Sequence, residues 1–321
     1  MRAKTSAGAT ALLLSAMVAG GALAEDVHVA TTAIVEHPAL DATRDGVRDA
    51  LKEAGYEVGK NLTFTYESAQ GNPGTAAQIA RKLVGDRPSV IVPISTPSAQ
   101  AVVAATEDIP VVFTAVTDPL GAKLVGSMEK PGGNVTGMSD LSPIGKHLAL
   151  IKEITPQAKT LGVPFNPGEA NSVTLLELIR KYAPEHGLEV VEAPAPRSAE
   201  VLAAAQSLIG KVDAIYVPTD NTIVSAFEAV VKVGVENRIP VYAGDTDSVP
   251  RGAVAALGFN YYDVGRQTGK MVVRVLKGER PGDLPVEGVE ITELHVNPVM
   301  AEKMGVELPQ AVVARAKTVV K

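Results

Sequence analysis

Short apolar, β-branched runs alternate with amphipathic segments along residues 25–321. Between the apolar runs, hydrophobic residues recur at helical spacing, as Leu40, Val47 and Leu51 do on one face of the first such segment. This alternation predicts an α/β fold with parallel sheets covered by helices on both sides. The runs predicted as strands are Val27–Ile34, Leu62–Tyr66, Val90–Ile94, Val111–Ala115, Thr160–Phe165, Glu189–Glu192, Ala214–Val217, Val241–Ala243 and Ala253–Phe259.

Three helix starts are signalled by capping residues. Asn72-Pro73 and Thr96-Pro97 each place a capping side chain before a proline at the first helical position. Asn171 precedes an apolar-periodic run and is predicted to cap it.

An internal echo predicts two related lobes. The segment 90–96, VIVPIST, is similar to the segment 215–221, IYVPTDN. Each opens a helix, and each is followed by an Ile-Pro-Val strand and then a Thr-Asp pair, Thr117-Asp118 in one case and Thr246-Asp247 in the other. The alternative is a chance similarity between Val-rich strands. In open parallel sheets ligands lie beyond the carboxyl ends of the strands, so two facing lobes would enclose a cleft lined by strand-end loops.

The first 24 residues differ from the rest. Arg2 and Lys4 precede an apolar run from Ala9 to Ala19, and Ala22-Leu23-Ala24 fits a small-residue cleavage site. This pattern predicts a secretory signal peptide cleaved after Ala24, and hence a periplasmic protein. The alternative is an N-terminal helix of the fold. With no cysteine in the chain, the protein is not a lipoprotein and has no thiolate chemistry.

Composition narrows the classes of function. The net charge is -6 with both signs interspersed, so no basic block is available for nucleic acid. Aromatic residues make up 4% of the chain and Trp is absent, which disfavours a sugar site built on ring stacking. No phosphate-binding, dinucleotide, nucleophile-elbow or zinc motif occurs, and the five histidines lack metal-ligand spacing. We therefore expect no cofactor, no metal and no enzymatic activity. His37 lies in a strand-end loop, where a surface or hydrogen-bonding role is expected rather than a ligand-binding or catalytic one.

Six motifs together resemble a known family. They are segments 36–41 (EHPALD), 95–100 (STPSAQ), 116–119 (VTDP), 131–137 (PGGNVTG), 166–172 (NPGEANS) and 219–221 (TDN). The set is similar to the TrpX-like family of ABC-transporter substrate-binding proteins, which includes tryptophan- and tyrosine-binding members. The resemblance covers essentially the whole chain after residue 24.

The resemblance implies a type I periplasmic binding protein fold, with two Rossmann-like lobes joined by a three-segment hinge. We place the crossovers near Ser139–Ser142, Leu257–Asn260 and Leu294–Asn297. The first lobe would then be residues 25–141 with 259–294, and the second 142–258 with 295–321.

The resemblance also implies an aromatic or hydrophobic amino acid as the ligand. Its carboxylate needs hydroxyl and N–H donors at helix N-termini, and its ammonium needs a carboxylate. For the carboxylate we predict Ser95, Thr96, Asn171 and Ser172. For the ammonium we predict either Asp220 or Asp245, with Asp220 slightly favoured because its loop repeats the Ser95-Thr96 loop. Asn221, beside Asp220, is also predicted to bind the ligand. Glu36, Thr117 and Asp118 are expected to line the cleft. Each of these residues could instead be an ordinary helix cap or loop residue.

The predicted function is that of the periplasmic receptor of an ABC importer, acting as a monomer that docks on an inner-membrane permease. The alternative is a sensor that presents an amino acid or a sugar to a membrane receptor. An enzyme on the same scaffold is a more distant alternative. A sugar-responsive transcription regulator would need a DNA-binding segment where the signal peptide stands.

Overall fold

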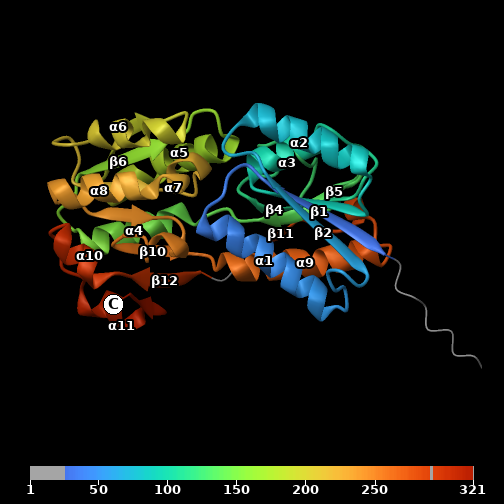
Figure 1. Cartoon of the computed structure of the whole chain (residues 1–321). Coiled ribbons are helices and arrows are strands. Elements are labelled where there is room, and N and C mark those ends of the chain that lie inside the picture. Colours follow the sequence, from blue (N-terminus) through green and yellow to red (C-terminus); the bar gives the residue numbers. More distant parts are fainter. Residues whose placement is uncertain (1–25, 290–291, 321) are drawn as a thin grey trace, which may run out of the picture.

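The computed structural model describes residues 26–289 and 292–320, which form two lobes lying side by side (Figure 1). The predicted signal peptide falls outside the described residues. Each lobe holds one twisted sheet with helices on both faces, so the predicted α/β fold of two lobes with parallel sheets is confirmed.

The first lobe is built on a six-stranded sheet in the spatial order β11-β5-β4-β3-β1-β2, with every described pair parallel. Its strands are β1 (Val27–Ala33), β2 (Leu62–Ser68), β3 (Val90–Ile94), β4 (Val111–Val116), β5 (Val135–Ser139) and β11 (Glu287–Gly288). Its helices are α1 (Pro38–Glu53), α2 (Pro73–Asp86), α3 (Thr96–Val103), α9 (Tyr261–Leu276) and the short η4 (Pro281–Asp283).

Alternate residues of these strands pack against different helices, as the pleat of a buried parallel sheet requires. Val29 and Val92 pack with residues of α1 and α9, whereas Ala30 and Ile91 pack with α2 and α3. Helices α1 and α9 approach closely at Gly46, where an added Cβ would lie only 2.2 Å from the Tyr262 carbonyl oxygen. The absence of a side chain at this glycine therefore permits the start of α9 to pack against α1.

The second lobe is built on a seven-stranded sheet in the order β13-β12-β10-β9-β8-β6-β7, parallel except for the β10–β12 pair. Its strands are β6 (Thr160–Phe165), β7 (Glu189–Pro194), β8 (Ala214–Val217), β9 (Val241–Ala243), β10 (Ala255–Gly258), β12 (Glu293–Val296) and β13 (Thr318–Val319). Its helices are α4 (Ile144–Ile154), α5 (Ala170–Tyr182), η1 (Ala183–His186), η2 (Ser198–Glu200), α6 (Val201–Gln206), α7 (Asn221–Ser225), α8 (Phe227–Asn237), η3 (Thr246–Ser248), α10 (Pro298–Lys303) and α11 (Gln310–Arg315).

The chain crosses between the sheets three times: after β5, after β10, and between β11 and β12. The third crossing comes a few residues earlier than the expected 294–297. The reason is that β12 already pairs antiparallel with β10 in the second sheet. Strand β5 was not among the sequence predictions, because its Gly137 and the preceding Gly-Gly-Asn indicate a turn.

Two predicted caps differ from the structure. Asn72 caps α2 as expected, accepting from the Thr75 N–H at 3.0 Å. Helix α5, however, begins at Ala170 with Glu169 as its N-cap residue, and the N-cap residue of α3 is Ser95 rather than Thr96. Asn171 is the second residue of the helix and so does not cap it, and its side-chain N–H groups donate to Glu169 and to the Thr219 carbonyl oxygen.

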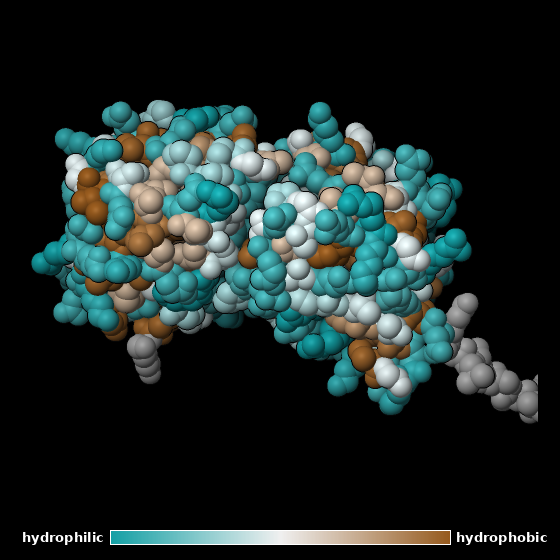
Figure 2. Space-filling view, turned by 45° about the horizontal axis from the view of Figure 1, so that its top comes forward, coloured by the Kyte–Doolittle hydropathy of each residue, from teal (hydrophilic) through white to brown (hydrophobic). Residues whose placement is uncertain are grey.

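Hydrophilic residues cover most of the face shown in Figure 2, with hydrophobic residues scattered among them and a waist between the lobes. No helix within residues 26–289 and 292–320 has both the length and the apolar character needed to span a bilayer.

Candidate functional site

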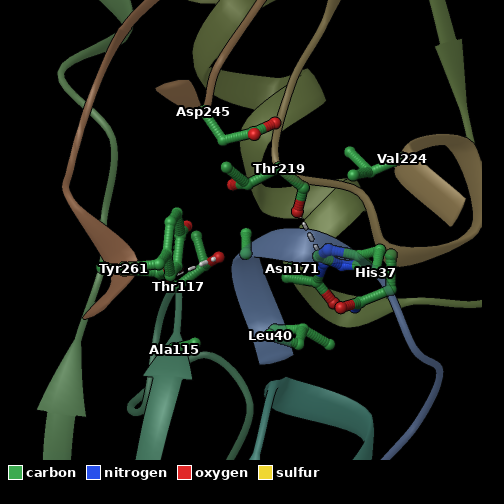
Figure 3. Close-up of a pocket in the computed structure, with 12 residues that line it drawn as sticks. His37, Leu40, Ala115, Thr117, Asn171, Thr219, Val224, Asp245 and Tyr261 are labelled. Atoms are coloured by element: carbon green, nitrogen blue, oxygen red, sulfur yellow. Dashed lines mark hydrogen bonds between the residues drawn. The ribbon is translucent and has the colours of Figure 1, made fainter. Parts of the chain in front are cut away.

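A cavity lies between the lobes, at the carboxyl ends of strands from both sheets (Figure 3). Its empty space is about 340 Å³, a volume that includes open solvent at the cavity mouth. The first lobe and the hinge contribute His37, Ala39, Leu40, Ala115, Thr117, Asp140 and Tyr261. The second lobe contributes Asn171, Thr219, Asn221, Val224 and Asp245.

Four of the ten predicted site residues line this cavity: Thr117, Asn171, Asn221 and Asp245. Ser95, Thr96, Ser172 and Asp220 are buried nearby without lining it. Glu36 and Asp118 lie in strand-end loops but also do not line it, and Glu36 accepts a 3.4 Å hydrogen bond from Gln70. Three polar residues of the cavity wall were not predicted from the sequence: Asp140, Thr219 and Tyr261. Asp140 follows β5, and recognising that strand would have drawn attention to this carboxylate.

Asp140 and Asp245 are the two acidic groups of the cavity wall, one from each side. The Tyr261 hydroxyl donates to Asp140 Oδ2 at 2.6 Å, and the Thr117 hydroxyl donates to Oδ1 at 3.4 Å. Asp245 caps η3 by accepting from the Ser248 N–H and hydroxyl at 2.8 and 2.7 Å. Burial raises the pKa of both carboxyl groups, because desolvation disfavours their charged form. No lysine or arginine is among the lining residues.

Both oxygens of the Asp220 carboxylate already accept hydrogen bonds from groups of the second lobe. Its Oδ1 accepts from the Ile223 N–H at 2.9 Å, while Oδ2 accepts from the Asn166 N–H at 2.6 Å and the Ser172 hydroxyl at 2.5 Å. Burial, and next the nearby charge of Glu169, raise its pKa to about 7. The contacts of Asp220 and Ser172 are therefore made within the second lobe.

Glu169 organises the same loops from the other side. Its two oxygens accept from Asn221 and Thr222 backbone N–H groups and from the side chains of Asn171, Asn221, Thr222 and Asn166. This network joins the start of α5 to the start of α7 and sets the positions of Asn171 and Asn221 in the cavity wall.

The N-terminus of α3 presents three buried hydroxyl groups without partners. Ser95, Thr96 and Ser98 are each at most 2% exposed, and none of their hydroxyl oxygens has a hydrogen-bond partner among the described residues. Ser95 also adopts φ +79°, a conformation that non-glycine residues rarely take and that is found at ligand-binding sites. Ser95 follows β3, and β3 neighbours β4, whose end supplies Ala115 and Thr117.

His37 is buried on the cavity wall and is not a surface residue, one of the two roles expected from its loop position. It is 9% exposed, and its Nδ1 has no partner among the residues described. Burial and then the charge of Arg251 lower its pKa to about 3. The part of the chain that the structure describes holds no cluster of three or more His, Cys, Asp or Glu suited to a metal ion.

Two α/β lobes that enclose a polar cavity at their strand ends, linked by three crossovers, define a two-lobed solute-binding protein. Residues 28–320 match the family model described as ABC transporter substrate binding protein, and the chain belongs to this family. Members of the family work in the periplasm or outside the cell.

Relatives with informative names are similar over most of the chain. A tyrosine-binding protein of Clostridioides difficile is 45% identical over 84% of this chain and 78% of its own length. A solved structure of a conserved domain protein from Vibrio cholerae has 52% identity, covers 92% of this chain and all of that one, and has a TM-score of 0.91. A complex of an ABC domain with L-Trp from Streptococcus pneumoniae has 36% identity, the same coverages and a TM-score of 0.89.

The lobe arrangement is nearer to the tryptophan complex than to an open form. The ligand-free, open structure of a Clostridium difficile substrate-binding protein is 42% identical over 92% of this chain and 99% of that one, yet its TM-score is only 0.69. Sequence divergence would give the opposite order, since the tryptophan complex is the less similar in sequence. The structure of this chain is therefore more similar to the tryptophan complex than to the open form.

Proposed function

We propose that this protein is the periplasmic receptor of an ABC importer for an aromatic amino acid, which it holds in the cavity between its lobes. In this proposal residues 1–24 direct export, the chain acts as a monomer without catalysis, and the closed form docks on the permease. The names of the tyrosine-binding relative and of the tryptophan complex support the ligand class.

The single observation that carries the proposal is a pair of carboxylates in a cavity wall that contains no lysine or arginine. Asp140 and Asp245 face one cavity from opposite lobes, and no basic residue is among its lining residues. Buried charges are stable only when paired, so the cavity calls for a ligand that brings a positive group. An α-ammonium between the two carboxylates meets this need. Of the two candidates from the sequence, the geometry favours Asp245 over Asp220.

The N-terminus of α3 supports a site for the ligand carboxylate. Its hydroxyl groups have no partner among the described residues, and the Ser95 N–H donates to the Thr114 carbonyl oxygen of the neighbouring strand β4 at 2.9 Å. The helix dipole adds positive potential at this point, and hydrogen bonds to an anion are stronger than neutral ones. The proposal gives Ser95 and Thr96 the carboxylate-binding role predicted from the sequence and adds Ser98. It leaves out Asn171 and Ser172, because their donor groups bond to other residues.

The remaining walls suit an apolar side chain. Ala39, Leu40, Ala115 and Val224 line the cavity without polar side-chain atoms. Ligand contacts from both lobes would favour the closed form, because a ligand shifts the equilibrium by its differential affinity for the two states.

Calorimetric titration of protein freed of carried-over ligand tests the proposal, using tyrosine, tryptophan and phenylalanine with a panel of sugars and acidic amino acids. We expect one or more aromatic amino acids to bind and the sugars not to bind. Asp140→Asn and Asp245→Asn should each weaken binding by about 2–3 kcal/mol, or roughly 30- to 150-fold, because each leaves the ammonium one carboxylate short.

Asp118→Asn is the matched control, since this residue lies in a strand-end loop without lining the cavity. Its affinity should equal that of the unaltered protein. Binding by both cavity variants at full strength would contradict the ammonium site, and binding of a sugar alone would contradict the ligand class.

A further inference from the structure

Two buried polar atoms in the cavity have no partner among the described residues, and neither is used by the proposed head-group contacts. The first is Nδ1 of His37, whose ring also has a side-chain hydrogen bond with Asn221. The amide nitrogen of Asn221 donates to Glu169 Oε2 at 2.5 Å, so we assign its oxygen as the acceptor of the imidazole N–H. The other nitrogen, Nδ1, is then a bare acceptor.

The second is Oδ1 of Asn171, on the opposite lobe. The amide nitrogen of Asn171 donates to the Thr219 carbonyl oxygen at 3.2 Å and to Glu169 Oε2 at 3.3 Å. These two acceptors fix the orientation of the amide, so the unpaired atom is the oxygen. Asn171 and His37 both line the cavity, and Figure 3 draws both on its wall.

Sheet order separates these acceptors from the acidic end of the cavity in both lobes. Asp140 follows β5 and His37 follows β1, with β4 and β3 between them, while Asp245 follows β9 and Asn171 follows β6, with β8 between them. Neighbouring strands lie about 4.8 Å apart, so the separation is roughly 14 Å in the first lobe and roughly 10 Å in the second. Figure 3 agrees: Tyr261, which bonds to Asp140, and His37 lie on opposite sides of the cavity.

Leu40 and Val224 supply apolar side chains to the same cavity wall as His37. The groups that act on the pKa of His37 are Arg251 and Asn221, with neither cavity carboxylate among them. A ligand whose ammonium sits between Asp140 and Asp245 would extend its side chain toward this end.

We infer that His37 and Asn171 form a subsite that accepts a hydrogen bond from a donor on the ring of the ligand. This inference rests on the proposed function and deepens it. A phenol O–H or an indole N–H supplies such a donor, whereas a phenyl ring supplies none and leaves both acceptors buried and unpaired. The protein therefore selects tyrosine or tryptophan over phenylalanine. A carboxylate cannot occupy this subsite, because it offers no donor.

The test measures the affinities of tyrosine, tryptophan and phenylalanine for a set of His37 variants by calorimetric titration. His37→Phe keeps a flat ring but removes the acceptor, and it sacrifices no helix cap because the His37 side chain makes no capping bond to α1. We expect it to weaken binding of the preferred donor-bearing ligand about 10- to 100-fold and to change phenylalanine affinity by less than about threefold. His37→Asn, whose side-chain oxygen can reach the position of Nδ1, should restore part of the preference.

Two matched variants separate specificity from packing. Leu40→Ala trims the apolar wall and should weaken all three ligands by similar factors. His186→Phe alters a histidine of η1, outside the cavity, and should leave all three affinities as they were.

The outcomes distinguish this inference from the proposed function. A preference for tyrosine or tryptophan that collapses only in His37→Phe supports the subsite. Equal weakening of all three ligands by His37→Phe, or no preference in the unaltered protein, overturns the subsite while aromatic amino acid binding stands. Absence of binding by all three ligands to the unaltered protein overturns the proposed function and the subsite together.

Discussion

The loops that follow β3 and β8 correspond to each other in the two lobes and have similar sequences, yet they differ in how their polar groups are used. After β3, the hydroxyl groups of Ser95 and Thr96 are buried and unpaired. After β8, Asp220 accepts three hydrogen bonds within its own lobe. The first loop therefore has hydroxyl donors available to a ligand, whereas the carboxylate of the second loop already accepts hydrogen bonds from its own lobe. Equivalent position in the topology therefore does not give equivalent function.

The largest effect that would test this difference is on stability. Asp220→Ala removes the cap of α7 and leaves the Asn166 N–H and the Ser172 hydroxyl without an acceptor. We expect the free energy of unfolding to fall by about 3 kcal/mol, even after relief of the repulsion from Glu169. Denaturant unfolding measures this loss, and ligand affinity should change by only a few fold. A stable variant that no longer binds would instead make Asp220 the ammonium partner that the sequence favoured.

The next effect is on binding. Ser95→Ala removes a hydroxyl that has no protein partner, so the free energy of unfolding should stay within about 0.5 kcal/mol of its original value. Alanine also keeps the Cβ and hence the strain at φ +79°. We expect the affinity for an aromatic amino acid to fall by about 1.5 kcal/mol, or roughly tenfold, measured by calorimetric titration. A destabilised variant with intact affinity would reverse the contrast between the two loops.

The smallest effect concerns the Thr-Asp pairs that follow β4 and β9. Burial, and next the charge of Asp245, raise the pKa of Asp247 to about 6. A raised pKa in the folded state gives stability that is fully present below pH 4 and is lost as the pH rises through about 6. Asp247→Asn removes this loss, so we expect the variant to be about 1–2 kcal/mol more stable than the unaltered protein at pH 8 and no more stable at pH 4.

Urea unfolding at the two pH values measures this difference. Asp118→Asn is the control from the first lobe, where the carboxylate accepts only the Gly121 N–H at 2.9 Å in a half-exposed loop. It should stay within about 0.5 kcal/mol at both pH values. A gain from Asp247→Asn that is equal at pH 4 and pH 8 would mean that the charge of Asp247 is not its cause.

The alternation of apolar runs and helical segments was sufficient to predict two parallel-sheet lobes, because strand and helix periods are local properties of the sequence. The same pattern placed Thr117, Asn171, Asn221 and Asp245 at strand ends, and strand ends form the cavity. Asp140 was not predicted because the segment of β5 that precedes it was not predicted as a strand. Gly137 weakens the strand pattern of this segment, and its pairing with β4 and β11 is visible only in the structure.

The sequence by itself determined the fold class, the two-lobe plan and the strand-end loops from which any site must be built. The tertiary structure alone decided which polar groups in those loops remain unpaired. A capping aspartate and a ligand-binding aspartate have the same local sequence pattern, and hydrogen bonds from distant residues separate them: Asn166 and Ser172 saturate Asp220, whereas Asp245 keeps a place on the cavity wall. His37 shows the same principle, since only packing by both lobes turns a loop histidine into a buried neutral acceptor.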